Sequence, residues 1–314
     1  MKKLLVVAAG AAMVCGGVFA QEAKAGETPA APAEIEEKDD AFPLEAGLDV
    51  DLFTAYVWRN AVQNDRPVAQ PCVWADWQVV DSFSLGFFVW QNYDLTNRRR
   101  SLGYRGEWNE TDYNIHAGAL LWESEDEETR LNLEFGHEWF TYNLHGRWDE
   151  EDGGYSKRKD YPTTYELYVK FELENPYLTP YTQVSYEYNR VDGVHYELGL
   201  RKEMTLSDLL ESENELLSQL TLAGDVNVNF GTAKYLTYLY DGDSEDEDDI
   251  GRGIGGLTAK LGLMWAPCDH FSIGGLVAFT SILNNEARDE FGKMDACCDS
   301  TDQVWGGIQA KVSF

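Results

Sequence analysis

The feature that most constrains this chain is a strict alternation of apolar and polar residues over segments of about ten residues. In one such segment, Leu131, Leu133 and Phe135 are separated by Asn132 and Glu134. Successive side chains of a β-strand point to opposite faces, so the segment predicts a strand with one apolar and one polar face. A slip of one residue would exchange the two faces, so the register is strongly specified.

The first twenty residues have the layout of a cleavable signal peptide, which we assign to 1–20. Lys2 and Lys3 form a positive start, a short apolar run follows, and Val18–Ala20 is a small-x-small cleavage site. The apolar run is too short to span a bilayer. Residues 21–43 are rich in Ala, Pro and Glu and cannot bury a core, so we expect a flexible periplasmic segment there.

The remainder of the chain, residues 44–314, is read as one domain of alternating segments separated by turn-rich or acidic stretches. We expect fourteen strands, with twelve and sixteen as the alternatives. The expected strands cover residues 46–58, 71–80, 82–92, 100–109, 112–122, 130–139, 141–149, 163–173, 179–190, 194–205, 217–230, 254–266, 270–282 and 303–314.

The connections between these strands fall into two sets that alternate along the chain. One set is short and includes residues 80–82, 110–111, 174–176 and 267–269. The other set includes residues 150–162, 231–253 and 283–302, which are long, acidic and rich in Gly. Short turns at one end and long loops at the other are typical of outer-membrane barrels.

Composition agrees with a membrane barrel. Aromatic residues make up 13% of the chain, with 10 Trp and 17 Tyr, which suits the aromatic girdles at the two membrane interfaces. No run of eighteen apolar residues occurs, so we expect no transmembrane helix. The sequence therefore predicts an all-β, transmembrane antiparallel up-and-down β-barrel in the bacterial outer membrane. A soluble secreted β protein is an alternative.

The last expected strand ends on an aromatic residue. Val304, Ile308 and Val312 alternate with polar residues up to Phe314, the final residue. A terminal aromatic residue at this place looks like the signal that the outer-membrane barrel assembly machinery reads. We therefore expect Phe314 to act as an assembly signal.

The first expected hairpin resembles the opening of the TorF-like porin family of bacterial outer-membrane β-barrels. The segment Tyr56–Arg59 matches the strand end of that family, and Gln70-Pro71 matches its next strand start. Asn60 stands where the family usually has Gly. The stretches at 164–168 and 196–199 are similar as well. The resemblance is loose, covers most of the expected barrel, and implies a pore without naming a solute.

The polar face of the strands is the natural place for function, because it would line the barrel interior. Carboxylates outnumber bases on that face, and Glu172, Glu203 and Asp225 belong to it too. We expect a passive diffusion channel for small hydrophilic solutes with a modest cation preference. The expected pore-lining residues are Asp49, Asp51, Arg59, Asp76, Arg105, Glu107, Glu134, Glu138, Arg147, Glu166, Lys170, Glu187, Glu197, Arg201, Lys260 and Lys311.

Two further readings concern partners and chemistry. With 55 acidic and 25 basic residues, the chain would repel nucleic acid, and its expected partners are outer-membrane lipid and lipopolysaccharide. His116 and His145 are expected to face inward, but no catalytic motif accompanies them, so we expect neither an enzyme nor a cofactor. A non-conducting structural or adhesive barrel with acidic extracellular loops is the alternative to a channel.

An acidic run near residue 245 is a weak candidate for Ca²⁺, with Asp241, Asp243, Glu245 and Asp246 as ligands. Its spacing does not match an EF-hand, and a solvated loop is the ordinary interpretation of such a run.

Four cysteines follow the expected cleavage site. In an oxidising compartment they permit three pairings, and a bond between the adjacent Cys297 and Cys298 would be strained. We expect Cys72 to pair with Cys297 or Cys298, and Cys268 to stay unpaired.

Overall fold

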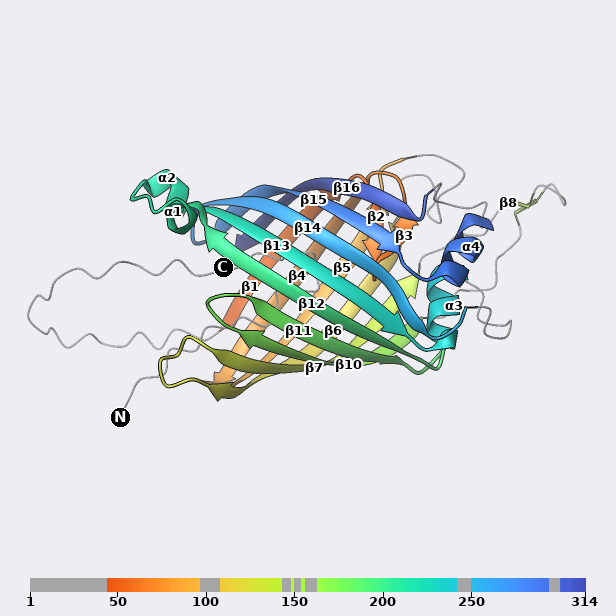
Figure 1. The fold of residues 1–314 in the computed structure, drawn as a ribbon, viewed down its shortest axis with the longest axis horizontal. Helices are drawn as coiled ribbons and strands as arrows, with labels where there is room; N and C mark the ends of the chain where they lie inside the picture. Colours follow the sequence, from red (N-terminus) through yellow and green to blue (C-terminus); the bar gives the residue numbers. More distant parts are fainter. Residues whose placement is uncertain are drawn as a thin grey trace, which may run out of the picture.

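The computed structural model describes residues 44–96, 108–142, 148–149, 154–155, 163–241, 250–293 and 300–314. Within these residues, twelve antiparallel strands form one closed barrel, in which β16 pairs with β1 (Figure 1). The barrel strands are β1 Leu44–Phe53, β4 Val68–Val80, β5 Phe83–Asp94, β6 Trp108–Glu123, β7 Arg130–Tyr142, β10 Thr164–Glu174, β11 Thr179–Glu187, β12 Gly193–Thr205, β13 Leu220–Gly231, β14 Gly253–Cys268, β15 Phe271–Ile282 and β16 Asp302–Ser313.

The other elements are short. Two small hairpins pair β2 with β3 and β8 with β9, and the described helices lie between barrel strands. Their bounds are β2 Tyr56–Trp58, β3 Ala61–Asn64, β8 Trp148–Asp149, β9 Gly154–Tyr155, α1 Leu206–Leu209, α2 Glu215–Ser218, α3 Ala233–Asp241 and α4 Asn285–Lys293. No helix among the described residues is long and apolar enough to cross a membrane.

The expectation of fourteen strands was wrong, and the twelve-strand alternative holds for the described residues. Glu110 and Thr111, expected to form a turn, lie inside β6, where they pair with Tyr142 and Thr141 of β7. The expected strand at 112–122 is therefore the continuation of β6. A polar pair resembles a turn in the sequence, but Glu110 faces a polar interior and is compatible with a continuous strand.

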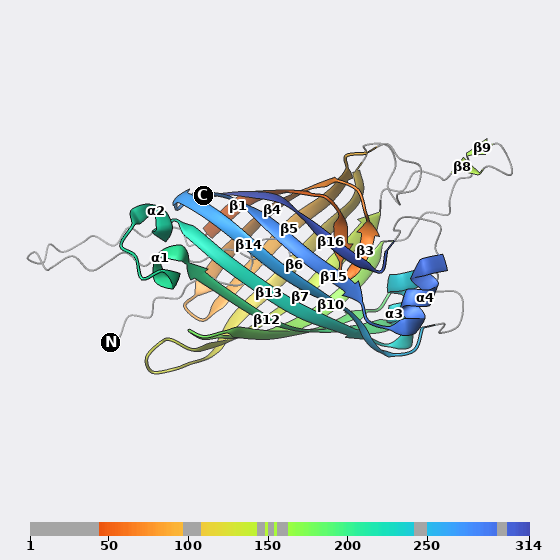
Figure 2. The same cartoon turned by 45° about the horizontal axis from the view of Figure 1, so that its top comes forward.

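The two ends of the barrel differ. The C-terminus, α1 and α2 lie at one end, which we call the Phe314 end, and α3 and α4 lie at the other, the α3 end (Figures 1 and 2). With twelve strands, the turn at 124–129 falls at the Phe314 end. In this turn the Ser124 hydroxyl and the Glu128 backbone N–H donate to Asp126, and these bonds hold the pKa of Asp126 below its usual range.

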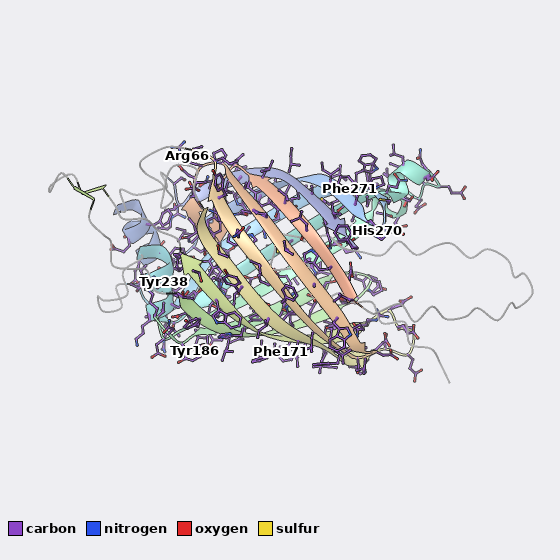
Figure 3. All side chains as sticks on the ribbon, turned by 180° about the vertical axis from the view of Figure 1, so that it is seen from behind. Arg66, Phe171, Tyr186, Tyr238, His270 and Phe271 are labelled. Atoms are coloured by element: carbon purple, nitrogen blue, oxygen red, sulfur yellow. The ribbon has the colours of Figure 1, made fainter. Side chains whose placement is uncertain are left out.

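The outside of the barrel is apolar. Phe171 and Tyr186, both about 40% exposed, lie on the outer surface (Figure 3). Large apolar side chains are exposed on alternate positions of the strands, among them Leu48, Leu52, Val73, Leu85, Phe87, Ile115, Phe135, Leu167, Leu198, Leu200, Leu261, Leu263, Val277 and Ile308. Many of their strand neighbours are buried polar residues of the interior, among them Asp49, Asn114 and Glu134. This is the reverse of the pattern in a soluble protein and the pattern of a barrel surrounded by lipid.

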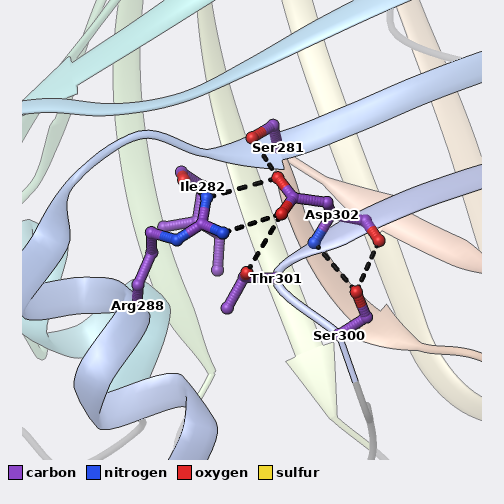
Figure 4. Close-up of polar contacts among 6 residues, drawn as sticks. All are labelled: Ser281, Ile282, Arg288, Ser300, Thr301 and Asp302. Carbon is purple, nitrogen blue, oxygen red and sulfur yellow. Dashed lines mark hydrogen bonds and ion pairs between the residues drawn. The ribbon is translucent and has the colours of Figure 1, made fainter.

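The α3 end is covered by an apolar cluster. The β2–β3 hairpin contributes Ala61 and Val62, α3 contributes Tyr235 and Leu236, and Phe291 comes from α4. Helix α4 is also tied to the barrel rim, where Arg288 donates to Asp302 at the start of β16 (Nη2 to Oδ2, 2.7 Å; Figure 4). The first hairpin, α3 and α4 therefore pack together over one mouth of the barrel.

Candidate pore and its constriction

The interior face carries the expected pore-lining residues that the structure describes. Asp49, Asp51, Asp76, Glu134, Glu138, Glu166, Lys170 and Glu187 are buried, and Arg59, Glu197, Arg201, Lys260 and Lys311 are partly buried. Arg105, Glu107 and Arg147 lie outside the described residues. Apart from Arg59, which lies in a hairpin turn, the described residues of this set lie on barrel strands, on the side away from the apolar exterior.

Sequence reasoning missed three interior side chains of β6. Glu110, Asp112 and Asn114 are all buried on the same face as His116. Glu110 was missed because the polar pair at 110–111 was interpreted as a turn, whereas Asp112 and Asn114 lay in the expected strand 112–122 but were not assigned to the interior. The alternation of Asp112 and Asn114 with the exposed Tyr113 and Ile115 is the signal that could have found them.

A chain of hydrogen bonds crosses the interior wall from β10 to β4. The Tyr168 hydroxyl donates to Glu134 (2.6 Å) and accepts from Asn114 Nδ2 (3.3 Å). Asn114 Oδ1 lies 2.9 Å from His116 Nδ1, and the other ring nitrogen of His116 lies 3.0 Å from Asp76 Oδ1. His116 therefore faces inward, as expected, and bridges two polar neighbours.

Near the Phe314 end, acidic and basic side chains share the interior. Trp74 Nε1 donates to Asp49 (3.3 Å), Gln309 donates to Asp51 (3.3 Å), and Lys311 lies 4.5 Å from the centre of the Trp74 ring. Asp49, Asp51, Gln309 and Lys311 line a small pocket together with Met264, Ser272 and Ala310. This part of the interior is polar and mixed in charge.

On the opposite wall, Glu172 is flanked by two bases. Lys170 Nζ lies 3.3 Å from Glu172 Oε2, and Arg201 donates to the other carboxylate oxygen. Lys170 also lies 5.7 Å from the centre of the Tyr181 ring. These contacts hold both cations against the wall.

The β2–β3 hairpin crosses the barrel interior near the α3 end. Its turn is formed by Arg59 (φ 48°) and Asn60 (φ 65°), two successive residues with positive φ, as a two-residue hairpin turn of the I′ type requires. The hairpin leaves the wall between β1 and β4. Its tip reaches β10, which lies five strands from β1 in one direction around the barrel and seven in the other.

Polar contacts attach the tip to three other strands. Arg59 Nη1 donates to Glu166 Oε2 of β10 (2.6 Å), and Nη2 of the same guanidinium donates to Glu166 Oε1. Asn229 of β13 donates to the Arg59 carbonyl (2.6 Å), and Asn60 donates to the Gly256 carbonyl of β14 (3.2 Å). The hairpin therefore bridges the interior from β10 to β13 and β14.

Aromatic rings surround the Arg59 guanidinium. Its Cζ lies 4.5 Å from the centre of the Trp58 ring, 5.6 Å from that of Tyr235 and 6.0 Å from that of Phe140. Arg59 also donates to the Tyr235 hydroxyl. The side chains of Arg59 and Glu166 are 8% and 1% exposed, so water is largely excluded from this ion pair.

The expected metal and disulfide residues fall mostly outside the described part of the chain. The Asp241 side chain, Asp243, Glu245 and Asp246 lie outside it, and within it no group of three or more His, Cys, Asp or Glu could hold a metal ion. Cys72 is disulfide-bonded, and Cys268 is a free, exposed thiol. Cys297 and Cys298 lie outside the described residues, so their pairing with Cys72 stays a prediction.

Comparison with known proteins gives distant structural similarity. No protein-family model matches the chain, and no curated protein matches it. LpxR from Salmonella typhimurium is similar at 12% identity, over 85% of this chain and 99% of that one, with a TM-score of 0.43.

Two further solved structures show the same level of similarity. The KdgM porin has 9% identity over 85% of this chain and 99% of that one (TM-score 0.41). The outer membrane phospholipase A from Escherichia coli has 12% identity over 85% and 92% (TM-score 0.40). At these scores the comparisons assign no function, and the architecture rests on the strand pairing described above.

Proposed function

We propose that this chain is a porin-like channel of the bacterial outer membrane that lets small hydrophilic solutes diffuse passively. The observation that carries the proposal is a hairpin that crosses the polar interior of a closed barrel with an apolar exterior. Such a hairpin narrows a pore and places charges where a solute must pass. The proposal includes no catalytic role and no cofactor. The narrower assignment to the TorF-like porins rests on the residues quoted above.

The proposed orientation puts the Phe314 end in the periplasm and the α3 end outside the cell. It is supported by the two-residue connections at 81–82 and 269–270, which lie at the Phe314 end. Lipid and lipopolysaccharide would contact the apolar exterior. The barrel assembly machinery would act on the last strand.

Single-channel conductance in planar bilayers tests the channel. We expect conducting events from the folded protein, and a larger conductance when residues 57–62 are replaced by a short Gly-Ser turn, because the constriction is then removed. The control is the same replacement in the periplasmic turn at 124–129. Absence of conductance from the folded native protein would contradict the proposal.

The proposed cation preference is tested at the carboxylates of the interior wall. Replacing Glu134 and Glu138 with Gln should shift the reversal potential in a salt gradient toward that of a non-selective pore, because two inward carboxyl groups are lost. Glu215→Gln, on the exposed helix α2, is the matched control. An equal shift in the control and the double variant would show that the wall does not set selectivity.

One observation favours the second candidate, a non-conducting structural or adhesive barrel. The apolar cluster of the first hairpin, α3 and α4 lies over the α3 end, and Tyr235, Leu236, Tyr240 and Ile250 are fully buried in it. A permanently packed cluster would close the mouth to solutes. The conductance experiment separates the two candidates, because this barrel would remain silent until the hairpin is shortened.

A further inference from the structure

We propose that Glu166, Trp58, Phe140 and Tyr235 form a binding site for organic cations that carry a guanidinium or alkylammonium group, and that Arg59 occupies this site in the resting barrel. We call these four residues the guanidinium cage. The inference rests on the proposed function and deepens it, because it names the class of solute that the constriction recognises.

The cage has the chemistry that recognises a planar cation. Both nitrogens at the tip of Arg59 donate to the two oxygens of Glu166, which is the bidentate geometry of guanidinium–carboxylate recognition. The three rings lie 4.5–6.0 Å from the guanidinium carbon, within the range of cation–π attraction. A free guanidinium group would meet the same partners.

The parts of the cage come from distant segments of the chain. Phe140 belongs to β7, Glu166 to β10 and Tyr235 to α3, whereas Trp58 and Arg59 belong to the hairpin. Arg59 and Glu166 are separated by 107 residues. Three of the four cage residues therefore come from outside the hairpin: the barrel wall and α3 supply Phe140, Glu166 and Tyr235. Arg59 reaches the cage from the β2–β3 hairpin, whose tip is also bonded to β13 and β14.

The contacts of the hairpin tip stabilise a turn whose backbone conformation is unfavourable for its residues. Arg59 and Asn60 both have the left-handed backbone conformation that non-glycine residues rarely adopt. The Arg59–Glu166 pair is one of the contacts that offset this strain. A cation that takes Glu166 removes that contact, so solute binding and release of the hairpin are coupled.

The wall next to the cage carries further carboxyl groups. Glu138 is the register partner of Glu166, and Asp112 is buried on the neighbouring strand β6. Within the described part of the chain, Asp112 Oδ1 is buried without a hydrogen-bond partner. A guanidinium or alkylammonium group that enters the cage therefore finds further carboxyl oxygens close by that can accept its hydrogen bonds.

The test measures binding of methylguanidinium to the purified, detergent-folded protein by isothermal titration calorimetry. Arg59→Ala should bind methylguanidinium about tenfold more tightly than the native protein, because the resident competitor is gone. Arg59→Ala with Glu166→Gln should lose this gain. Arg66→Ala is the matched control: Arg66 follows the same hairpin, pairs with the adjacent Asp65 and is 36% exposed (Figure 3). It should bind as the native protein does.

Equal binding by the native protein and Arg59→Ala, or unchanged binding when Glu166 is also replaced, would overturn the inference. If Arg59→Ala does not fold, Arg59→Lys serves instead. Lysine keeps the charge but cannot bind the carboxylate in a bidentate manner, so methylguanidinium should compete with it more effectively than with Arg59. An unchanged affinity in Arg59→Lys would count against the cage.

Because binding is measured without a membrane, the result is independent of conductance. A barrel that binds methylguanidinium in Arg59→Ala but never conducts would refute the channel and retain the cage. A barrel that conducts, yet binds methylguanidinium no more tightly when Arg59 is replaced by Ala, would refute the cage and retain the channel.

Discussion

At the scale of single residues, two glycines make room for the interior hydrogen-bond chain. A Cβ at Gly136 would lie 2.4 Å from the Tyr168 ring, and a Cβ at Gly86 would lie 2.3 Å from His116 Nε2 and 2.0 Å from Asp76 Oδ1. Each glycine sits opposite a large side chain that lies flat against the wall. The missing side chain is therefore what allows Tyr168 to reach Glu134 and His116 to reach Asp76.

Gly136→Ala should destabilise the barrel by about 1–3 kcal/mol, because the Tyr168 ring must move and its hydrogen bond to Glu134 is weakened. The measurement is urea unfolding in detergent micelles. Gly224→Ala is the matched control, since the nearest atom to its added Cβ is 3.9 Å away. The packing argument fails if both variants unfold at the same urea concentration.

At the scale of elements, β6 shows how a lumen-facing polar residue can imitate a turn. Glu110 and Thr111 lie among the 16 residues of this strand, and each of them has a register partner in β7. In a soluble sheet, a buried Glu beside Thr would argue against a strand. In a barrel with a polar interior it does not, because Glu110 points toward other polar groups.

Replacing Glu110 by Asn and Thr111 by Gly, an ideal hairpin turn, separates the two strand counts. If 110–111 lies inside β6, the change should impair folding by about 1 kcal/mol or more, since Gly weakens a strand interior. The same replacement at Asp81 and Ser82, a true turn, should be tolerated. Heat-modifiable migration in gels reports the folded fraction, and tolerance at both sites would contradict the twelve-strand register.

At the scale of the whole molecule, the barrel depends on pairing its first strand with its last. Seven residue pairs join β1 to β16, from Gly47 with Ser313 to Phe53 with Gly307. Beyond them the Phe314 N–H donates to the Ala46 carbonyl (2.8 Å), and the Ala46 N–H donates back (3.3 Å). The Phe314 side chain is 78% exposed, so it is free to meet lipid or an assembly factor.

Deletion of Phe314 should reduce assembly into the outer membrane severalfold, because the closing hydrogen bonds and the terminal aromatic ring are lost together. Conductance of the molecules that do assemble should be unchanged, since Phe314 lies outside the interior. Phe314→Tyr, which keeps both the backbone and an aromatic ring, is the control. If the deletion variant assembles normally, Phe314 is not part of the assembly signal.

The sequence by itself determined which residues face the apolar exterior and which face the interior. Glu134, Glu138 and Glu166 were assigned inward from alternation alone, because the two-residue period of a strand is a local property. The strand count was less secure. At Glu110, local polarity does not distinguish a turn from a lumen-facing position, and only the pairing with β7 decides.

Only the tertiary structure decided what narrows the barrel. Arg59 could be expected to line a pore, but its pairing with Glu166 joins residues 107 positions apart across the barrel. Its aromatic neighbours Phe140 and Tyr235 come from two further elements. No local pattern encodes such contacts, since they depend on barrel closure and on the path of the first hairpin. The face of a strand on which a residue lies thus follows from the two-residue alternation in the sequence. What narrows the barrel follows from how the strands and the first hairpin are connected in space.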